Sequence, residues 1–311
     1  VDVTLTVAPE PLMATGLDRT VCSDEASGIV LNVINTGILA ASYNILNIAT
    51  SLPSSAGAPV FPALNVSNTE IQDDAWTNTG TTAATVIYTV QAVGLNNCIG
   101  DPIDIVLTVD PEPIGEINLN AQICSGQNIG LTYDVASGSI PASFYNFTSI
   151  TVDPTLIASP ANQPVANGVG ANYSQTDQYT NTSGATASVF YTYAPVSADN
   201  CVGDPITVEI AVLSQPVLAS NLNTAVCSDD PSGILLDTAV GSTPATSYTI
   251  LSITNPAGLI QSAGGTTTVG SGFPANEIAD DAYTNSTSTD AIITFEVAPV
   301  SSDGCVGEAQ N

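Results

Sequence analysis

The sequence is nearly without positive charge. Its 311 residues include one basic side chain, Arg19, and no histidine, against 29 acidic residues, so that the formal net charge is −28. A protein that binds nucleic acid neutralises phosphates with lysine and arginine, and an anionic lipid surface attracts the same residues. The composition therefore excludes nucleic acid as a partner and argues against insertion into, or attraction to, a membrane.

The lack of histidine and lysine also removes the usual bases that activate a serine, threonine or cysteine nucleophile. Paired carboxylates can hydrolyse glycosides, but the neighbours Asp73 and Asp74, like Asp280 and Asp281, would point to opposite faces of a strand. We therefore expect that the protein is not an enzyme. No segment keeps a helical period, and no apolar run is long enough to span a membrane as a helix.

What the sequence does contain is one unit repeated three times. Residues 77–102 read TNTGTTAATVIYTVQAVGLNNCIGDP, and the pattern returns as TNTSGATASVFYTYAPVSADNCVGDP at 180–205 and as TNSTSTDAIITFEVAPVSSDGCVGEA at 284–309. Each copy follows an aromatic residue, runs through alternating apolar positions and closes on Cys-x-Gly. The period indicates three units of about a hundred residues, which is near the commonest domain size.

Short strands separated by turn residues are expected throughout. Strand signals in the first unit lie at 28–33, 42–48, 86–93 and 103–109, and related signals recur in the other two units, for example at 130–134 and 233–237. Clusters of Gly, Pro, Ser and Asn separate them. The pattern predicts an all-β fold of three tandem Ig-like β-sandwich domains, which short Pro-containing linkers hold in an extended rod.

The first residues match the end of a repeat. Their apolar positions alternate on one face of a strand, at Val1, Val3, Leu5 and Val7. Related strands follow the second cysteine at 103–113 and 206–216, whereas the third unit has no such strand. The predicted domains are 1–13, the final strand and linker of a preceding or neighbouring repeat, then 14–113, 114–216, and 217–311 without its last strand.

Two explanations of this arrangement remain open. The 311 residues are either one period of a longer covalent array, or a subunit whose residues 1–7 complete the third domain of a neighbouring copy by strand donation. Either way the partners are further copies of the same repeat. An unpaired sheet edge is expected in the third domain. Because the chain has no initiator methionine and no signal peptide, we expect a mature or excised piece of a secreted protein.

Six cysteines fall two per unit, which is typical of disulfides in small extracellular β domains. One disulfide per domain is predicted, in the pairs Cys22–Cys98, Cys124–Cys201 and Cys227–Cys305. The rival set is Cys98–Cys124 and Cys201–Cys227, which leaves the first and last cysteines alone. Disulfides indicate an oxidising, extracellular compartment.

Calcium is the expected ion if a cofactor is bound, because it takes six to eight oxygen ligands. The candidate ligands in the first unit are Asp24, Glu25, Glu70, Asp73 and Asp74. Their relatives in the third unit are Asp229, Asp230, Glu277, Asp280 and Asp281. The middle unit has Gly126 and Gln127 at the first two positions, so a site there should be missing or altered. Aspartates are also ordinary turn residues without a metal, and this alternative stays open.

The motifs D-x-[WY]-T-N-[TS], V-x-Y-x-V and C-x-G-D-P with a closing proline, in this order, resemble the PKD-like repeats of Bacteroidota surface proteins. The resemblance covers all three units and departs from the pattern at 305–309, CVGEA. It implies Ig-like domains of tandem arrays exported by type IX secretion, such as giant adhesins used in gliding.

The expected function is a structural or adhesive segment of an extracellular bacterial surface filament or giant repeat adhesin, which meets an unknown surface or glycan. Two alternatives are a calcium-dependent module that binds carbohydrate or another surface, and a filament subunit assembled by strand donation.

Overall fold

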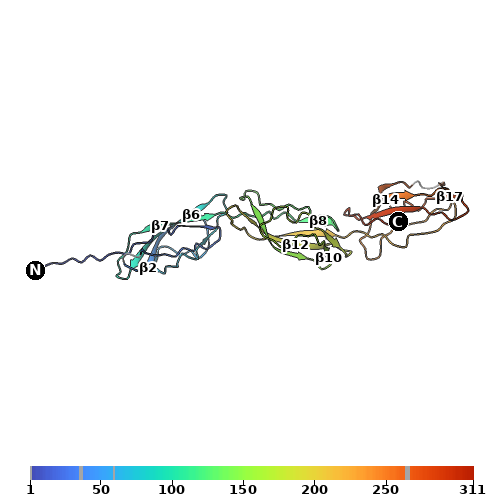
Figure 1. Ribbon diagram of the computed structural model, residues 1–311. Helices are drawn as coiled ribbons and strands as arrows, with labels where there is room; N and C mark the ends of the chain where they lie inside the picture. Colours follow the sequence, from blue (N-terminus) through green and yellow to red (C-terminus); the bar gives the residue numbers. More distant parts are fainter. Residues whose placement is uncertain (1, 35–37, 59, 263–266) are drawn as a thin grey trace.

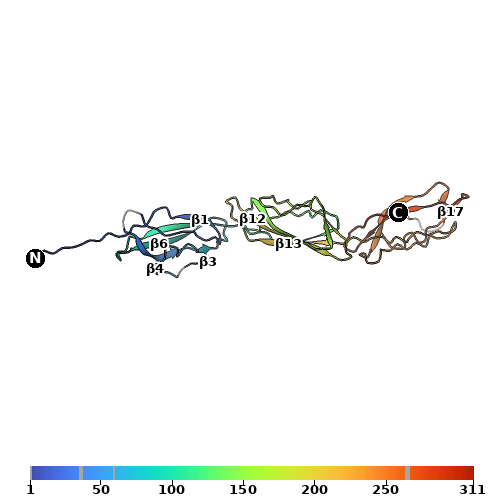
Figure 2. The ribbon, with the colours of Figure 1, turned by 60° about the horizontal axis from the view of Figure 1, so that its bottom comes forward.

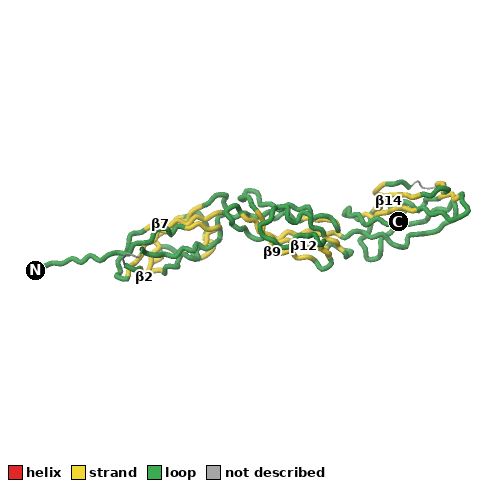
Figure 3. Tube along the Cα trace, viewed as in Figure 1, coloured by secondary structure: helices red, strands yellow, loops and turns green. Residues whose placement is uncertain are grey.

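The computed structural model describes residues 2–34, 38–58, 60–262 and 267–311. Three β domains lie end to end, and the first residues leave the first domain as an extended tail (Figures 1 and 2). Strands and loops make up the described chain, as Figure 3 shows. That part of the chain contains no helix long and apolar enough to cross a membrane. The prediction of an all-β fold of tandem Ig-like domains is confirmed.

The first domain is built on a five-stranded sheet. Its order is β1 (Arg19–Cys22), β7 (Ile103–Asp110), β6 (Ala84–Gly94), β2 (Ala40–Ala49) and β4 (Ala63–Val66). A small second sheet pairs β3 (Ser54–Ala56) with β5 (Ala75–Trp76). The edge strand β1 runs parallel to β7, and the other neighbours are antiparallel.

The second domain repeats this arrangement. Its main sheet has the order β8 (Ala121–Cys124), β13 (Ile206–Leu213), β12 (Ala187–Val196) and β9 (Phe144–Val152). Its small sheet pairs β10 (Leu156–Ala158) with β11 (Tyr179–Asn181). Here too the edge strand, β8, is parallel to the last strand, β13.

The third domain has a smaller main sheet. Its order is β16 (Gly270–Phe273), β14 (Ser247–Thr254) and β18 (Thr294–Val300), beside a pair of β15 (Leu259–Gln261) and β17 (Tyr283–Asn285). Within the described residues, no strand takes the places of β8 and β13. One flank of β18 is therefore left without a neighbouring strand.

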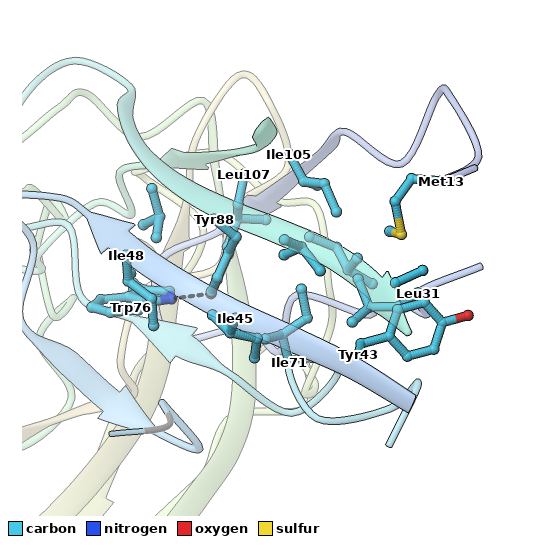
Figure 4. Close-up of a cluster of buried hydrophobic side chains, with 14 of the residues drawn as sticks. Met13, Leu31, Tyr43, Ile45, Ile48, Ile71, Trp76, Tyr88, Ile105 and Leu107 are labelled. Atoms are coloured by element: carbon cyan, nitrogen blue, oxygen red, sulfur yellow. Dashed lines mark hydrogen bonds between the residues drawn. The ribbon is translucent and has the colours of Figure 1, made fainter. Parts of the chain in front are cut away.

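The core of each complete domain lies between its two sheets. Alternate side chains of β6 point inward, so that Val86, Tyr88 and Val90 are fully buried. Trp76 packs beside them and donates a hydrogen bond from Nε1 to the Tyr88 hydroxyl at 2.8 Å (Figure 4). Burial of each large apolar side chain contributes about 1.5–3 kcal/mol to stability. In the third domain the counterpart of Tyr88 is Phe295, which is only half-buried.

The strand expected at 28–33 is not formed, although its alternating pattern is used. Ile29, Leu31 and Val33 are buried in the core as a strand face would be. The backbone instead makes single hydrogen bonds to loop carbonyls, such as Leu31 N to Asn68 O at 2.8 Å. The counterparts at 130–134 and 233–237 are irregular in the same way. The alternation of apolar residues at 28–33 therefore reflects the burial of one face of this segment, although the segment forms no β ladder.

Candidate functional site

Disulfides join neighbouring domains rather than closing each domain on itself. Cys22 of the first domain is bonded to Cys201 of the second, with Cα atoms 5.4 Å apart. Cys124 of the second domain is bonded to Cys305 of the third, with Cα atoms 5.5 Å apart. The remaining two cysteines of the described chain, Cys98 and Cys227, are free.

The predicted pairs Cys22–Cys98, Cys124–Cys201 and Cys227–Cys305 are therefore wrong, and strand pairing explains why. Parallel pairing with β7 places Cys22 opposite Asp110, at the end of that strand. Cys98 comes before the start of β7. Seven residues of strand separate the two ends by roughly 23 Å. A disulfide needs Cα atoms within about 7 Å, so the two cysteines of a domain cannot meet.

The rival pairs Cys98–Cys124 and Cys201–Cys227 fail for the same reason. The late cysteine of each domain lies in the hairpin before the last strand, at the end that faces the preceding domain. The early cysteine lies at the opposite end, facing the following domain. Only the early cysteine of one domain and the late cysteine of the next approach each other, which is a pairing that spacing along the sequence does not reveal.

A proline and a glycine form the second part of each junction. The carbonyl oxygen of Pro113, in the linker, lies so close to Gly203 that a Cβ added to the glycine would overlap it. Pro216 meets Gly307 in the same way. The Cys-x-Gly motif thus has two functions at the junction, because the cysteine forms the disulfide and the missing Cβ lets the linker approach.

A third copy of this contact lies at the free end of the first domain. The carbonyl of Pro11 lies against Gly100, and Pro9 O accepts a hydrogen bond from Asn96 Nδ2 at 2.9 Å. Cys98 lies beside this contact in sequence and is free in the described chain, which does not include Val1 of the predicted first strand. The proline–glycine contact of the two inner junctions is therefore repeated here without the disulfide.

Acidic groups converge on the junction between the first and second domains. Glu112 of the linker is half-buried, and burial raises the pKa of its carboxyl to about 7, with further increases from the charges of Asp204 and Asp24. Asp204 belongs to the second domain and Asp24 to the first. Deprotonation of Glu112 adds a negative charge near those of Asp204 and Asp24, so electrostatic repulsion at this junction is weaker while the Glu112 carboxyl is protonated.

The turn after each early cysteine explains the aspartates that the sequence marked as ligands. Asp24, Gly126 and Asp229 occupy equivalent positions and have φ values of 61°, 76° and 67°. This left-handed backbone is open to glycine and tolerated by aspartate. Gly126 therefore forms the same turn, and the loss of a metal site is not needed to explain why glycine stands there.

The carboxylates of this turn are occupied by hydrogen bonds. Asp24 Oδ1 accepts from Thr77 Oγ1 at 2.6 Å, and Glu25 Oε2 accepts from the backbone nitrogen of Cys22 at 3.2 Å. Burial raises the pKa of Asp24, but hydroxyl donors from Thr77, Ser55 and Ser23 together outweigh it and lower the pKa. In the third domain Asp229 accepts from Thr284 Oγ1 in the same way.

Asp74 points into the core of the first domain. It is fully buried, and its Oδ2 accepts a hydrogen bond from the Tyr88 hydroxyl at 2.9 Å. The same arrangement occurs in the second domain, where Asp177 Oδ2 accepts from the Tyr191 hydroxyl at 2.7 Å. In the third domain Asp281 is also buried. The sequence analysis did not single out Asp177, although its place in D-x-[WY]-T-N matched the other two.

The remaining predicted ligands do not gather into one site. Asp73, Asp230 and Asp280 are exposed, and Glu70 and Glu277 are half-buried. Across the described ranges, no group of three or more acidic or cysteine side chains is placed to hold a metal. Calcium binding stays a prediction.

We expect Asp74→Asn to remove most of the pH dependence of the first domain's free energy of unfolding. Burial raises the pKa of Asp74 to about 6, the Tyr88 hydrogen bond lowers it in part, and Asp73 and Glu70 raise it further. Because the folded domain holds this proton more tightly than the unfolded chain, the protonated Asp74 carboxyl contributes its full stabilisation below about pH 4. This stabilisation is lost as the pH rises through about 6, which lowers the free energy of unfolding by on the order of 3 kcal/mol.

Urea unfolding at pH 4 and pH 8, followed by the fluorescence of Trp76, measures this dependence in the first domain, because the chain has one tryptophan. Asp73→Asn, at the exposed neighbour, is the matched control and should keep most of the wild-type dependence. Equal pH dependence in wild type and Asp74→Asn would contradict the prediction.

A family model for the PKD-like domain matches residues 58–113 and 121–216. These segments cover the later part of the first domain and almost all of the second. No protein of curated function matches the chain.

Three similar solved structures are a protocadherin, a contactin and a bacterial surface protein. The protocadherin GammaB4 extracellular domain is 9% identical with a TM-score of 0.24; the match covers 96% of this chain and 49% of that one, so the chain spans about half of its length. The chicken CNTN1 FN1-FN3 domains are 11% identical with a TM-score of 0.29, covering 97% and 96%. A SusE-like surface located polysaccharide binding protein of Bacteroides thetaiotaomicron is 10% identical with a TM-score of 0.28, covering 91% and 55%.

Proposed function

We propose that this chain, which contains PKD-like Ig domains, is a force-carrying segment of an extracellular fibre or repeat adhesin on a bacterial surface. The observation that carries the proposal is the pair of disulfides between successive domains. A disulfide inside a domain protects that domain alone. A disulfide across a junction fixes one domain against the next, which matters where orientation or tension passes along the chain.

The compartment and the charge support this proposal. Disulfides persist in oxidising environments such as the outside of the cell. The net charge of −28 makes neighbouring rods repel one another and so opposes lateral aggregation. The match of 58–113 and 121–216 to the PKD-like domain, together with the motifs described above, supports a Bacteroidota cell surface as the place of this fibre. A calcium-dependent carbohydrate-binding module has no such supporting contact.

Small-angle X-ray scattering of the oxidised chain tests the proposal. We expect an extended particle of narrow length distribution, and a broader distribution for Cys22→Ser/Cys201→Ser, because the first junction then becomes a hinge. The matched control is Cys98→Ser/Cys227→Ser, which also replaces two cysteines by serine but leaves both disulfides in place. Identical scattering from the two double variants would overturn the idea that the disulfides hold the rod.

A further inference from the structure

We propose that the junction between the first and second domains is a pH-dependent joint. The protonated carboxyl of Glu112 donates a hydrogen bond to the carbonyl oxygen of Ser23 and holds the linker against the first domain, and loss of the proton breaks this bond and loosens the junction. The inference rests on the proposed function and deepens it, because the stiffness of one junction then depends on acidity. Its failure would leave the interdomain disulfides and the rod unaffected.

The second junction contains the hydrogen bond that serves as the template. Gln215, in the linker that follows β13, donates from Nε2 to the carbonyl oxygen of Ser125 at 2.9 Å. Ser125 directly follows β8 and is 4% exposed. The bond therefore ties the linker back to the domain that it leaves and fixes the direction in which the linker runs to the third domain.

The first domain presents the same two groups in the same places. The backbone nitrogen of Ser23 donates to Asp110 O at 2.8 Å, and this acceptor lies two residues before Glu112. Ser125 makes the same backbone bond at 2.8 Å, to the residue two positions before Gln215. Both side chains are half-buried, and each is followed by the proline whose carbonyl contacts a glycine of the next domain. The side chain of Glu112 is therefore placed to reach Ser23 O.

Only one protonation state of Glu112 can make this bond. An amide carries N–H donors and a protonated carboxyl carries one O–H donor, whereas an ionised carboxylate only accepts hydrogen bonds. Ser23 is 5% exposed, and its carbonyl oxygen accepts no hydrogen bond from the described residues. A buried carbonyl favours a donor. The protonated carboxyl supplies that donor, and the carboxylate would instead place negative charge beside the carbonyl oxygen.

The surroundings favour the protonated form up to neutral pH. Burial, and then the charges of Asp204 and Asp24, raise the pKa of Glu112 to about 7. Both neighbours are negative, and the one basic side chain of the chain, Arg19, is not among the charges that act on this carboxyl. An ordinary carboxyl titrates near pH 4. Glu112 therefore changes its charge at a pH where ordinary carboxylates stay ionised.

The second junction lacks most of this acidity as well as the titrating group. An amide stands in place of the Glu112 carboxyl, and the acids of the turn after the early cysteine are replaced by Gly126 and Gln127. The counterpart of Asp204 is Glu308, which stays acidic. An amide does not titrate, so the bond from Gln215 persists at every pH. The chain thus carries a matched junction without the switch.

The sign of the effect follows from linkage. The closed junction holds the Glu112 proton more tightly than an open junction, in which the pKa returns toward its ordinary value of 4.5. The contribution to docking is therefore complete below about pH 4.5 and is lost as the pH rises through about 7. One pKa unit corresponds to a tenfold change in the docking equilibrium. We expect docking about tenfold weaker at pH 8.5 than at pH 5.5.

Small-angle X-ray scattering of the Cys22→Ser/Cys201→Ser chain at pH 5.5 and pH 8.5 tests the joint. Both disulfides of the described chain join different domains, so this change leaves each core intact while only non-covalent contacts hold the first junction. We expect a narrower length distribution at pH 5.5. Adding Glu112→Gln should keep the distribution narrow at both values, because the amide is a permanent donor.

Equal breadth at the two pH values in the Cys22→Ser/Cys201→Ser chain, or a pH dependence that survives Glu112→Gln, would overturn the inference. Either result would leave the proposed function standing if the chain stays broader than the oxidised wild type at both values. A distribution as narrow as that of wild type at pH 8.5 would instead contradict the role of the disulfide.

The reverse exchange at the second junction completes the test. In the Cys124→Ser/Cys305→Ser chain the first junction keeps its disulfide, so scattering reports the second junction alone. We expect no change between pH 5.5 and pH 8.5, and a distribution that broadens with pH once Gln215→Glu is added. A pH dependence in the chain with Gln215 as large as that of the first junction would overturn the inference.

Carbon-13 NMR of the carboxyl groups measures the proton directly in the oxidised wild-type chain. One glutamate resonance should titrate near pH 7 and be absent from Glu112→Gln. The same resonance should move toward the ordinary range in the Cys22→Ser/Cys201→Ser chain, because the open junction lets water reach the carboxyl. A Glu112 carboxyl that titrates below pH 5 in the oxidised chain would overturn the inference.

Discussion

Pulled from its two ends, the oxidised chain should extend to about one third of the length that it reaches after reduction. The shortest covalent path crosses from Cys22 to Cys201, runs back to Cys124 and crosses to Cys305. It contains about 107 residues, which stretch to roughly 375 Å at about 3.5 Å per residue. The reduced chain of 311 residues stretches to about 1,090 Å. Single-molecule force spectroscopy with and without reductant measures both lengths.

The two disulfides overlap along the sequence, which sharpens this test. With one bridge removed, the path through the other contains about 130 residues and stretches to roughly 460 Å, whichever bridge remains. Removing either bridge by a double Cys→Ser change should therefore add only roughly 85 Å to the maximum extension, and only the variant without both should match the reduced chain. Gains in length of equal size for the first and the second bridge removed would contradict the observed pairing.

Gly203→Ala should disrupt the junction between the first and second domains. The added Cβ would overlap the carbonyl oxygen of Pro113, which is backbone and cannot turn away. Overpacking of this kind costs about 1–3 kcal/mol. The displaced linker should also hinder the Cys22–Cys201 bond, so that oxidative refolding leaves a large share of molecules with four free thiols instead of two.

Thiol titration of the denatured chain after refolding provides the count. Gly170→Ala is the matched control in the same domain, because a Cβ added there meets no atom within 4 Å and the backbone is not left-handed. If Gly203→Ala refolds with the same two thiols and the same stability as Gly170→Ala, the close approach at the junction has no structural role.

The sequence predicted the features that depend on local pattern. Alternation in β6 placed Val86, Tyr88 and Val90 on one face, and the structure buries all three. The lack of a last strand in the third unit also follows from comparing repeats. The pairing of Cys22 could not be predicted, because it depends on β1 running parallel to β7 rather than antiparallel to it.

Acidic residues show the same limit. Asp73 and Asp74 are adjacent and chemically identical, yet one is exposed and the other is buried beside Tyr88. The sequence analysis placed the two side chains on opposite faces but took both as candidate ligands, because the sequence does not say which of the two carboxylates turns into the core. The left-handed turn at Asp24 was likewise hidden until the equivalent Gly126 showed the same backbone.

Overlap of the two bridges also gives the chain tolerance to proteolysis. A backbone cut between residues 22 and 124 leaves fragments joined through Cys201, and a cut between 201 and 305 leaves them joined through Cys124. After a cut between residues 124 and 201, both disulfides join the two fragments. One nick anywhere from Cys22 to Cys305 thus leaves the molecule in one piece. A surface fibre exposed to foreign proteases would then be severed between Cys22 and Cys305 only after a cut in each of the three intervals 22–124, 124–201 and 201–305.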